Sequence, residues 1–523
     1  ASDVYKRQML RSVPELLRHF QELYPYICVD EAQDTSKIQH AIIALLASGS
    51  ENLFMVGDED QSIYGFRAAY PEALLTFEKN YPDAKVLLME ENFRSDARIV
   101  LAADRFIQKN TLRHEKHMKA ARKPASDIRE ISLRSRKAQY TYLAKLAEGC
   151  TSQTAILYRD NECILPLVDL LERNGIPYQM RNAELSFFSH RTILDIINII
   201  KLAQKPMDTE AFLQIYYKIG TYLRKQDAIR IARISEEKRI PVLDVAAEDP
   251  DLNGHVLGSV RSMRTHLQNL LQDSGERALY RIMQYMGYQE YLNRSGLSDS
   301  KLEILRILGS RADSPMELAE RLEQLKVLIR EKEPDRKCPL ILSTIHASKG
   351  LEYDSVYLID VADGILPESI PQNLHQASAE ELKAYEEERR LFYVGVTRAK
   401  DHLTLFTTNR PSTFCSEFLG KSSVTEEGRK NLMPVESRIS RTFKQARPYA
   451  AVAGIRQTKA SEELYFRLKE ELGTGVIVEH KKYGEGVVTQ LDDRLVHIMF
   501  QDDTLRMMDL KILANAGLLK VKK

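Results

Sequence analysis

The fold is decided by a short apolar run that ends on two carboxylates, Ile27-Cys28-Val29-Asp30-Glu31-Ala32-Gln33-Asp34-Thr35. Tyr26 to Val29 has the length and composition of a buried strand. A second apolar run, Leu53 to Val56, ends on Gly57. Apolar runs that are each followed by a helical pattern are typical of parallel sheets. We therefore expect an α/β fold with polar side chains at the carboxyl ends of its strands.

The same alternation returns further along the chain. Thr154 to Tyr158, Leu340 to Ile345 and Val356 to Ile359 are further candidate strands. Strand signals vanish between about Gln204 and Lys337, where charged segments with helical spacing replace them. The middle of the chain is therefore predicted to be a helical insertion.

The C-terminal part has a different pattern. Gln445 to Lys459 lacks large apolar anchors at either period and predicts a linker. Beyond it, apolar residues alternate on both sides of a turn expected at Gly484 and Gly486, which predicts a small antiparallel barrel. The alternating residues are Val476, Val478, Val487, Val488, Val496, Ile498 and Phe500.

Composition bounds the class of protein. The 523 residues are enough for several domains, and 75 Lys plus Arg against 74 Asp plus Glu exclude strong overall basicity. Any nucleic-acid binding must come from local patches. The five scattered cysteines do not have the spacing of a disulfide framework or a zinc site, which favours a reducing cytoplasm. No membrane span or signal peptide is predicted.

The adjacent carboxylates suggest chemistry on a nucleoside triphosphate. At a strand end, Asp30 can hold Mg²⁺ while Glu31 orients and deprotonates an attacking water. The alternative is a helix N-terminus that carries acidic residues, which is common for an isolated Asp-Glu pair.

A second run strengthens the interpretation: Val56-Gly57-Asp58-Glu59-Asp60-Gln61-Ser62-Ile63-Tyr64-Gly65-Phe66-Arg67. Together the two runs resemble motifs of the UvrD/Rep family of superfamily 1 DNA helicases. The resemblance implies that Gln61 senses the γ-phosphate of ATP. It implies that Tyr64, Phe66 and Arg67 touch single-stranded DNA. Phe66 stands where the family usually has Trp, and its alternative is an aromatic packed in a core.

Three later runs resemble further motifs of the same family. Glu91 to Ser95 implies that Phe93 stacks on the adenine and that Arg94 reaches the γ-phosphate. Thr344 to Tyr353 implies that Thr344 and His346 lie along the DNA and that Glu352 contacts the nucleotide sugar. Glu386 to Lys400 implies that Arg398 neutralises charge on the transferred phosphoryl group. The remaining roles implied by the resemblance are those of Asp30 as metal ligand and Glu31 as base.

Two of these residues have plain structural alternatives. An isolated His such as His346 is more often a satisfied structural residue. The run around Arg398 also fits an amphipathic surface helix with ion pairs, which accounts for Glu387 and Arg390 but less well for Arg398.

The sequence lacks one part that such a motor needs. No GxxxxGK run followed by Ser or Thr, the loop that holds the β- and γ-phosphates, occurs in the 523 residues. We expect that loop upstream and interpret the chain as an N-terminally truncated fragment, in which Ala1 to Gln8 match nothing expected of the family. The insertion also departs from the family, because Tyr217 to Thr221 stands where an Arg-Gly-Ile-Gly turn grips duplex DNA.

The resemblance implies two RecA-like parallel-sheet domains of the P-loop NTPase class, the first incomplete. The expected segments are residues 1–91 for the first motor domain, 92–203 and 338–435 for the second, 204–337 for the helical insertion, 436–472 for a linker and 473–523 for a Tudor-like β-barrel.

The implied function is that of an ATP-dependent 3'-to-5' DNA helicase that uses ATP and Mg²⁺ in DNA repair or replication. Single-stranded and duplex DNA would be its partners, with RNA polymerase or repair proteins as further partners of the barrel. The alternative is an ATPase-inactive fragment that binds DNA or RNA polymerase. A helicase–nuclease fusion is disfavoured because no further acidic metal-binding domain follows.

Overall fold

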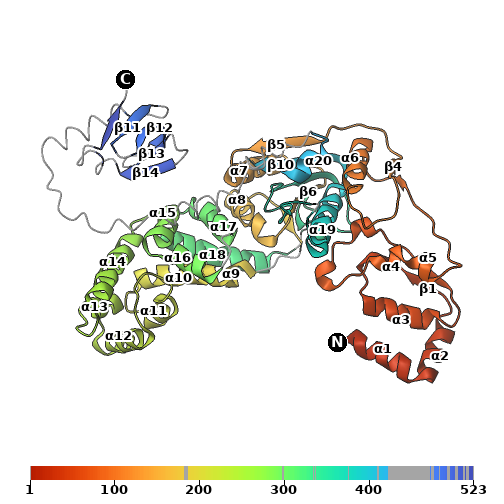
Figure 1. Ribbon diagram of the computed structural model, residues 1–523, viewed down its shortest axis with the longest axis horizontal. Coiled ribbons are helices and arrows are strands. Elements are labelled where there is room, and N and C mark those ends of the chain that lie inside the picture. The colour runs from red at the N-terminus through yellow and green to blue at the C-terminus, as the bar shows by residue number, and fades with distance from the viewer. Residues whose placement is uncertain are drawn as a thin grey trace. The chain divides into compact units, whose positions relative to one another are not determined.

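The computed structural model divides into two compact units, residues 1–423 and 424–523. It describes residues 2–181, 186–296, 300–333, 335, 337–374, 376–408, 412–421, 472, 476–481, 483–491, 495–500, 505–509, 513 and 518–521. The linker predicted at 436–472 lies outside the described residues except for Leu472. Figure 1 shows the element order along the chain.

The centre of the first unit is a six-stranded parallel sheet with the order β5-β10-β9-β6-β8-β7. Its strands are β5 (Arg129–Leu133), β6 (Thr154–Tyr158), β7 (Gln179–Met180), β8 (Leu340–Thr344), β9 (Tyr353–Leu358) and β10 (Ala399–Thr408). The predicted strands at 154–158, 340–345 and 356–359 are therefore confirmed, as is their parallel arrangement.

Both faces of this sheet are covered, which explains why its strands are apolar without alternation. On β6, Ile156 and Tyr158 belong to one buried cluster, whereas Ala155 and Leu157 belong to the other. The first cluster includes residues of α7 (Arg136–Glu148) and α8 (Leu165–Arg173). The second includes residues of α6 (Ala97–Ile107), α19 (Ala379–Val396) and α20 (Thr413–Phe418).

Local sequence sets where these helices begin. Asp96 and Ser135 accept backbone N–H bonds at the starts of α6 and α7, and Ser378 with Glu381 forms a capping box at the start of α19. Such caps satisfy the free N–H groups of a first helical turn. The helix starts can therefore be predicted from short polar patterns.

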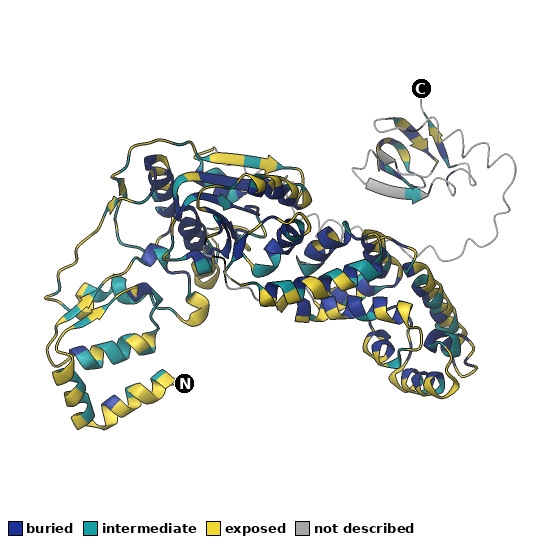
Figure 2. Cartoon of the chain, turned by 180° about the vertical axis from the view of Figure 1, so that it is seen from behind, coloured by how far each residue is buried: buried dark blue, intermediate teal, exposed yellow. Residues whose placement is uncertain are grey.

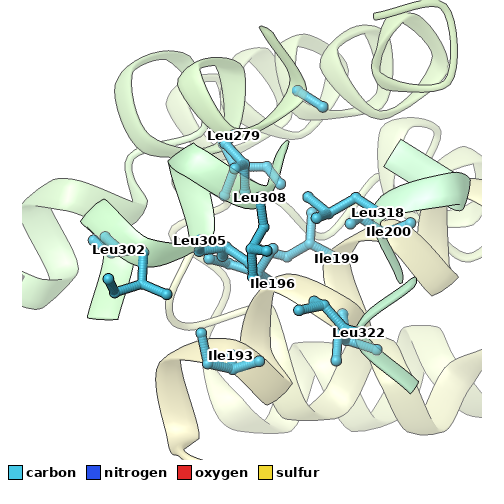
Figure 3. Close-up of a cluster of buried hydrophobic side chains, with 14 of the residues drawn as sticks. Ile193, Ile196, Ile199, Ile200, Leu279, Leu302, Leu305, Leu308, Leu318 and Leu322 are labelled. Carbon is cyan, nitrogen blue, oxygen red and sulfur yellow. The ribbon is translucent and has the colours of Figure 1, made fainter. Parts of the chain in front are cut away.

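The middle of the chain is helical, as predicted, with no strand among the described residues between β7 and β8. Ten labelled side chains from α10, α15, α17 and α18 converge on one another in its core (Figure 3). The helices and turns of this region are α9 (Ser186–Ser189), α10 (Arg191–Gln204), α11 (Thr209–Ile215), α12 (Lys225–Lys238), α13 (Val242–Ala247), α14 (Gly254–Leu270), α15 (Gly275–Tyr280), a π-helix (Arg281–Tyr285), α16 (Tyr288–Ser295), α17 (Ser300–Gly309) and α18 (Pro315–Glu331).

Residues before 91 form a smaller assembly. Its strands β1 (Ile27–Val29) and β2 (Leu53–Met55) pair in parallel. Its helices are α1 (Ser2–Ser12), α2 (Pro14–Leu23), α3 (Lys37–Ala47), α4 (Glu72–Leu75) and α5 (Phe77–Asn80), with short 3₁₀ turns η1 (Ala32–Asp34), η2 (Glu59–Gln61) and η3 (Gly65–Arg67). A further short parallel pair, β3 (Glu91–Asn92) with β4 (Lys119–Ala120), follows.

The predicted burial of the strand before Asp30 is wrong. Cys28 is exposed, and Tyr26 and Phe54 are 75% and 62% exposed. The physical reason is that one face of this two-stranded sheet, which carries Cys28 and Phe54, is left uncovered, whereas the other face, with Ile27 and Val29, is half-buried. Figure 2 shows the contrast between the exposed N-terminal helices and the buried central strands.

The second unit contains a five-stranded antiparallel sheet, which confirms the antiparallel pattern predicted for this region. Its strands are β11 (Ile477–His480), β12 (Gly484–Leu491), β13 (Leu495–Phe500), β14 (Leu505–Asp509) and β15 (Leu519–Val521). Gly486 lies within β12 and not in the turn. A Cβ at this position would collide with Ile498, which explains why the residue is a glycine.

Two findings concern the expected compartment. All five cysteines are free. None of the helices that the structure describes is both long and apolar enough to cross a bilayer.

The core around α6 yields a stability prediction. The Phe106 ring is fully buried and lies 4.9 Å from the Phe392 ring and 5.3 Å from the Phe414 ring. Phe106→Ala leaves a cavity and is expected to lower the free energy of unfolding by roughly 3–5 kcal/mol. Urea denaturation followed by far-ultraviolet circular dichroism measures this.

Leu101→Ala on the same helix is the matched control, because Leu101 is 63% exposed. Its effect should stay within about 0.5 kcal/mol. Equal losses for the two variants would contradict the assignment of Phe106 to the core.

Candidate functional site

The two carboxylates after β1 lie at the open end of the small sheet. Val29 pairs with Met55, so the chain leaves β1 and β2 at the same edge. Glu31 has a left-handed backbone (φ 50°), and its N–H donates to Asp30 Oδ1 at 2.8 Å. The following turn is a three-residue 3₁₀ helix without a side-chain cap. Glu31 thus stands at the N-terminus of this short turn, so the alternative of a helix N-terminus that carries acidic residues stays open.

Gln61 is held between two charged groups. Its Nε2 donates to Asp58 Oδ2 at 2.8 Å. Its Oε1 accepts from Arg398 Nη2 at 3.4 Å. A carboxylate only accepts hydrogen bonds and a guanidinium only donates them, so the orientation of this carboxamide is fixed.

Arg398 is the largest fully buried side chain, 1% exposed. Its guanidinium donates only to neutral oxygens, the carbonyls of Val394 and Leu351, the Gln61 side chain and the Thr397 hydroxyl. Among the described residues no carboxylate forms an ion pair with it. Burial and the nearby charge of Arg94 lower the pKa of Arg398 to about 10. The charged side chain thus has no ion-pair partner among the described residues, although the carboxylates of Glu31 and Asp58 lie near enough to attract it.

The helix that carries this motif is not a surface helix. From Tyr385 to its end α19 is mostly buried, including Arg389 and Arg390. Arg390 donates to the carbonyl of Ser62 at 2.9 Å, and Glu387 accepts the N–H of Gly65 at 2.8 Å. The alternative that explained Glu387 and Arg390 by ion pairs on an exposed face is therefore wrong.

Lys349 lies at the centre of the site, although its sequence context predicted no role for it. Its side chain is 6% exposed, and its Nζ lies 2.6 Å from Asp34 Oδ2 and 3.6 Å from Glu31 Oε2. It also donates to the Gln61 carbonyl at 2.7 Å. Lys349 lies in the quoted run from Thr344 to Tyr353, but its burial against residues some 300 positions away has no local signature.

Arg94 and Glu352 form an ion pair at 2.8 Å beside an open groove of about 430 Å³. Lys400 approaches the other Glu352 oxygen at 3.0 Å. Phe93, 70% exposed, also lines this groove. The structure therefore brings Phe93, Arg94 and Glu352 together, as the resemblance implies for a nucleotide site.

A second cluster combines aromatic rings with two cations, Arg67 and Lys349, and Lys349 Nζ lies 5.5 Å from the Tyr64 ring. The Phe66 ring lies 5.8 Å from Tyr64 and 5.6 Å from His346. The guanidinium of Arg67 lies 5.0 Å from the Tyr64 ring. Phe66 is 69% exposed, so the alternative of a core aromatic is wrong. The cluster offers flat rings and positive charge on one surface.

His346 lies in the aromatic cluster, whereas Thr344 bonds within its own turn. Burial and the charge of Arg159 lower the pKa of His346 to about 4, so its ring is neutral near pH 7. Thr344 is buried, and its hydroxyl accepts the N–H of Ala347 at 3.1 Å. Its contact in this structure is with its own turn, and it does not join the aromatic surface.

The turn from Tyr217 to Thr221 is anchored inside the helical region. Lys218 is 6% exposed and lies 2.5 Å from Asp195, which also accepts from the Tyr288 hydroxyl at 2.9 Å. Gly220 donates to the carbonyl of Met286 at 2.8 Å. The one cation of the turn is therefore already paired within the protein.

No group of three or more His, Cys, Asp or Glu side chains that could hold a metal occurs in the part of the chain that the structure describes. Asp30 is the exposed carboxylate at the end of β1. A single carboxylate with phosphate oxygens and waters is a donor set that suits Mg²⁺. The residues present thus fit an ion that arrives with a phosphate ligand.

Two domain families match consecutive parts of the chain. The UvrD/REP helicase N-terminal domain matches residues 4–82. The UvrD-like helicase C-terminal domain matches residues 87–410. Because the first match begins at residue 4, the expectation that Ala1 to Gln8 are foreign to the family is wrong for residues 4–8.

Named relatives agree with these matches. The chain is 31% identical over 409 residues to the putative ATP-dependent DNA helicase YjcD of Bacillus subtilis (strain 168), which covers 75% of this chain and 53% of that protein. It is 28% identical over 521 residues to the ATP-dependent DNA helicase PcrA of Staphylococcus epidermidis and 26% identical over 523 residues to PcrA of Staphylococcus aureus. These two alignments cover 93% of this chain and 69% of each relative.

The chain thus spans about half the length of the Bacillus relative. The C-terminal-domain match alone covers more than half of the 523 residues. The resemblance inferred from the motifs is confirmed: the chain belongs to the UvrD/REP helicase family, among the PcrA-like superfamily 1 helicases.

Proposed function

We propose that this chain forms most of the motor of an ATP-dependent DNA helicase that moves 3'-to-5' along single-stranded DNA. One observation carries the proposal: the fully buried Arg398 guanidinium has only neutral partners and touches Gln61. A buried charge without a counter-ion is costly, so such a site favours an anionic ligand. The γ-phosphate of ATP supplies that anion.

The proposed roles on the nucleotide side come from the resemblance, and the positions of the side chains support them. Glu31 accepts the proton of the attacking water, Gln61 and Arg94 hold the γ-phosphate, and Arg398 balances the charge that develops on it. Phe93 stacks on the adenine and Glu352 contacts the sugar. Asp30 would hold Mg²⁺, which when bound neutralises phosphate charge.

Lys349 supports the base in this scheme. It lies 3.6 Å from Glu31 and 2.6 Å from Asp34, so its ammonium group forms ion pairs with both side chains. Burial raises the pKa of Asp34, and the hydrogen bond and charge of Lys349 oppose that rise. Lys349 also joins the Gln61 backbone to these carboxylates. The base and the phosphate sensor are thus linked by one ammonium group.

The proposed DNA contact is the aromatic cluster of Tyr64, Phe66, Arg67 and His346. Exposed rings stack on bases of any sequence, and arginine adds attraction to the backbone. His346 is neutral near pH 7 and would contribute a ring face rather than a charge. Thr344 would reach the DNA only if its turn rearranges.

The division of the chain into domains is also proposed. We interpret β1 and β2 as the core of an incomplete first RecA-like domain and the six-stranded sheet as the second, with the boundaries given above. The C-terminal sheet would be a Tudor-like module for RNA polymerase or repair proteins. Polarity and a role in repair or replication rest on the resemblance alone.

A second function is favoured by one specific observation. The sequence contains no GxxxxGK run with a following Ser or Thr. A chain without this loop would bind DNA without hydrolysing ATP. Phosphate release by the 523-residue chain, with and without single-stranded DNA, separates the two: DNA-stimulated hydrolysis supports the motor, and DNA binding without hydrolysis supports the binding fragment.

The DNA-contact proposal predicts that Phe66→Ala weakens binding to single-stranded DNA. Loss of one stacked base contact is worth about 1–3 kcal/mol, which corresponds to roughly a 5- to 150-fold rise in Kd. Fluorescence anisotropy with a labelled oligo(dT) at fixed salt measures it.

Phe66→Trp should keep the affinity because it keeps a stacking face. Phe54→Ala is the matched control, since the Phe54 ring is 62% exposed but lies on β2. Unchanged binding by Phe66→Ala would refute the stacking role.

The nucleotide proposal predicts a specific loss for Arg398→Ala in a preparation that hydrolyses ATP. The value of kcat should fall by roughly 10³- to 10⁵-fold, with little change in KM for ATP, because the guanidinium acts on charge that develops in the transition state. Phosphate release at saturating single-stranded DNA is the measurement. Arg129→Ala, which removes an exposed arginine from β5, is the control and should keep the wild-type rate.

A further inference from the structure

Three consecutive carboxylates, Asp58, Glu59 and Asp60, directly precede Gln61. Glu59 and Asp60 are 3% and 2% exposed. They lie against the loop that follows α6, which brings Arg113, His114 and Lys116 to them. Buried carboxylates need such partners, because unpaired charges are costly inside a protein.

The loop contacts each carboxylate separately. Arg113 binds Asp60 with two bonds, at 3.0 Å and 2.9 Å. The backbone N–H of His114 donates to Glu59 at 2.8 Å. Lys116 Nζ lies 2.6 Å from Asp58, 3.0 Å from Glu59 and 3.4 Å from Asp60. Among the residues that the structure describes, Lys116 is therefore the one cation that forms ion pairs with all three.

Asp58 connects this loop to the phosphate sensor. Its Oδ1 accepts from Lys116, and its Oδ2 accepts from Gln61 Nε2 at 2.8 Å. Burial alone would raise the pKa of Asp58, but the charge of Lys116 and the hydrogen bonds from Lys116 and Gln61 outweigh it, so this pKa lies below its usual value. Asp58 is therefore an ionised acceptor that selects the amino end of the Gln61 carboxamide.

The other end of the carboxamide is then fixed as well. With Nε2 on Asp58, Oε1 turns to Arg398 Nη2 at 3.4 Å. One N–H of Nε2 is used by Asp58, and the second N–H is left for an acceptor such as a phosphate oxygen. A flipped carboxamide would place its oxygen against Asp58 and its amino group against Arg398, with repulsion at both ends.

We propose that Lys116 is a positioning residue, which holds Asp58 on Gln61 and so fixes the carboxamide of Gln61 between Asp58 and Arg398. The proposal deepens the proposed function and rests on it for the role of Gln61 toward the γ-phosphate. The pathway Lys116, Asp58, Gln61, Arg398 consists of contacts within hydrogen-bond distance. Lys116 itself touches no substrate.

A merely structural role makes a different prediction. If Lys116 only neutralises buried carboxylates, its loss changes stability but leaves the Gln61 carboxamide where it is. If Lys116 positions Gln61, its loss changes the environment of the Gln61 side-chain N–H groups. The readout must therefore report on that amide group itself.

The experiment is NMR of the side-chain amides in the 523-residue chain, deuterated and labelled with ¹⁵N-glutamine, without nucleotide. The Gln61 signal pair is assigned by its absence in Gln61→Glu. In Lys116→Met this pair is expected to shift toward the position of solvent-exposed glutamine amides. Lys116→Arg should restore most of the wild-type position.

Lys119→Met is the matched control. Lys119 lies just beyond the same loop and forms an exposed ion pair with Glu90 at 2.8 Å, without contact to the acidic triplet. Its loss should leave the Gln61 pair unmoved. An unmoved pair in folded Lys116→Met would overturn the proposal.

Asp58→Asn keeps the proposal testable if Lys116→Met does not fold. With Lys116 intact, the Gln61 pair should shift, because the Asn side chain no longer offers Gln61 Nε2 a carboxylate. A pair that stays at its wild-type position in Asp58→Asn refutes the pathway. Because no nucleotide is present, these outcomes are independent of whether the chain hydrolyses ATP, which is decided by phosphate release.

Discussion

The placement of one buried arginine organises the candidate site. Arg398 follows the end of α19, and its guanidinium reaches the carbonyls of Val394 and Leu351 and the side chain of Gln61. It has no carboxylate partner among the described residues, whereas the neighbouring Arg94 pairs with Glu352. The site therefore holds one buried guanidinium without an ion pair, which the packing of α19 against the central sheet keeps out of water.

The segment from Asp58 to Arg67 joins the small N-terminal sheet to the rest of the first unit. Ile63 belongs to the same buried cluster as residues of the central sheet. The segment contacts α19 through the Ser62 carbonyl and the Gly65 N–H. It contacts the loop after α6 through the bond between Asp58 and Lys116. On the side of β1, the Gln33 side chain accepts the N–H of Asp58, and Lys349 donates to the Gln61 carbonyl. The Gln61 side chain thus contacts Asp58 in the first proposed motor domain and Arg398 in the second, while Glu31 follows the end of β1.

The strands could be predicted because their signals are local. Thr154 to Tyr158 is apolar throughout and is buried on both faces of a parallel sheet. The same reasoning failed for Tyr26 to Val29, because burial depends on what packs against each face of a strand and not on the composition of the strand. The alternative for Glu387 and Arg390 failed for a related reason, since an alternating charge pattern does not show what packs against the helix.

The sequence by itself determined the family, the strands β6, β8 and β9 of the central sheet and the order of the motifs, because each is written in a few contiguous residues. Only the tertiary structure decided which side chains contact one another. Tyr64 meets His346 across 282 positions, and Gln61 meets Arg398 across 337. It also decided that Lys349 and Lys116 are buried cations, that Thr344 caps its own turn and that Lys218 is already paired with Asp195. Such pairings follow from how helices and strands pack over long separations, and no local pattern encodes them.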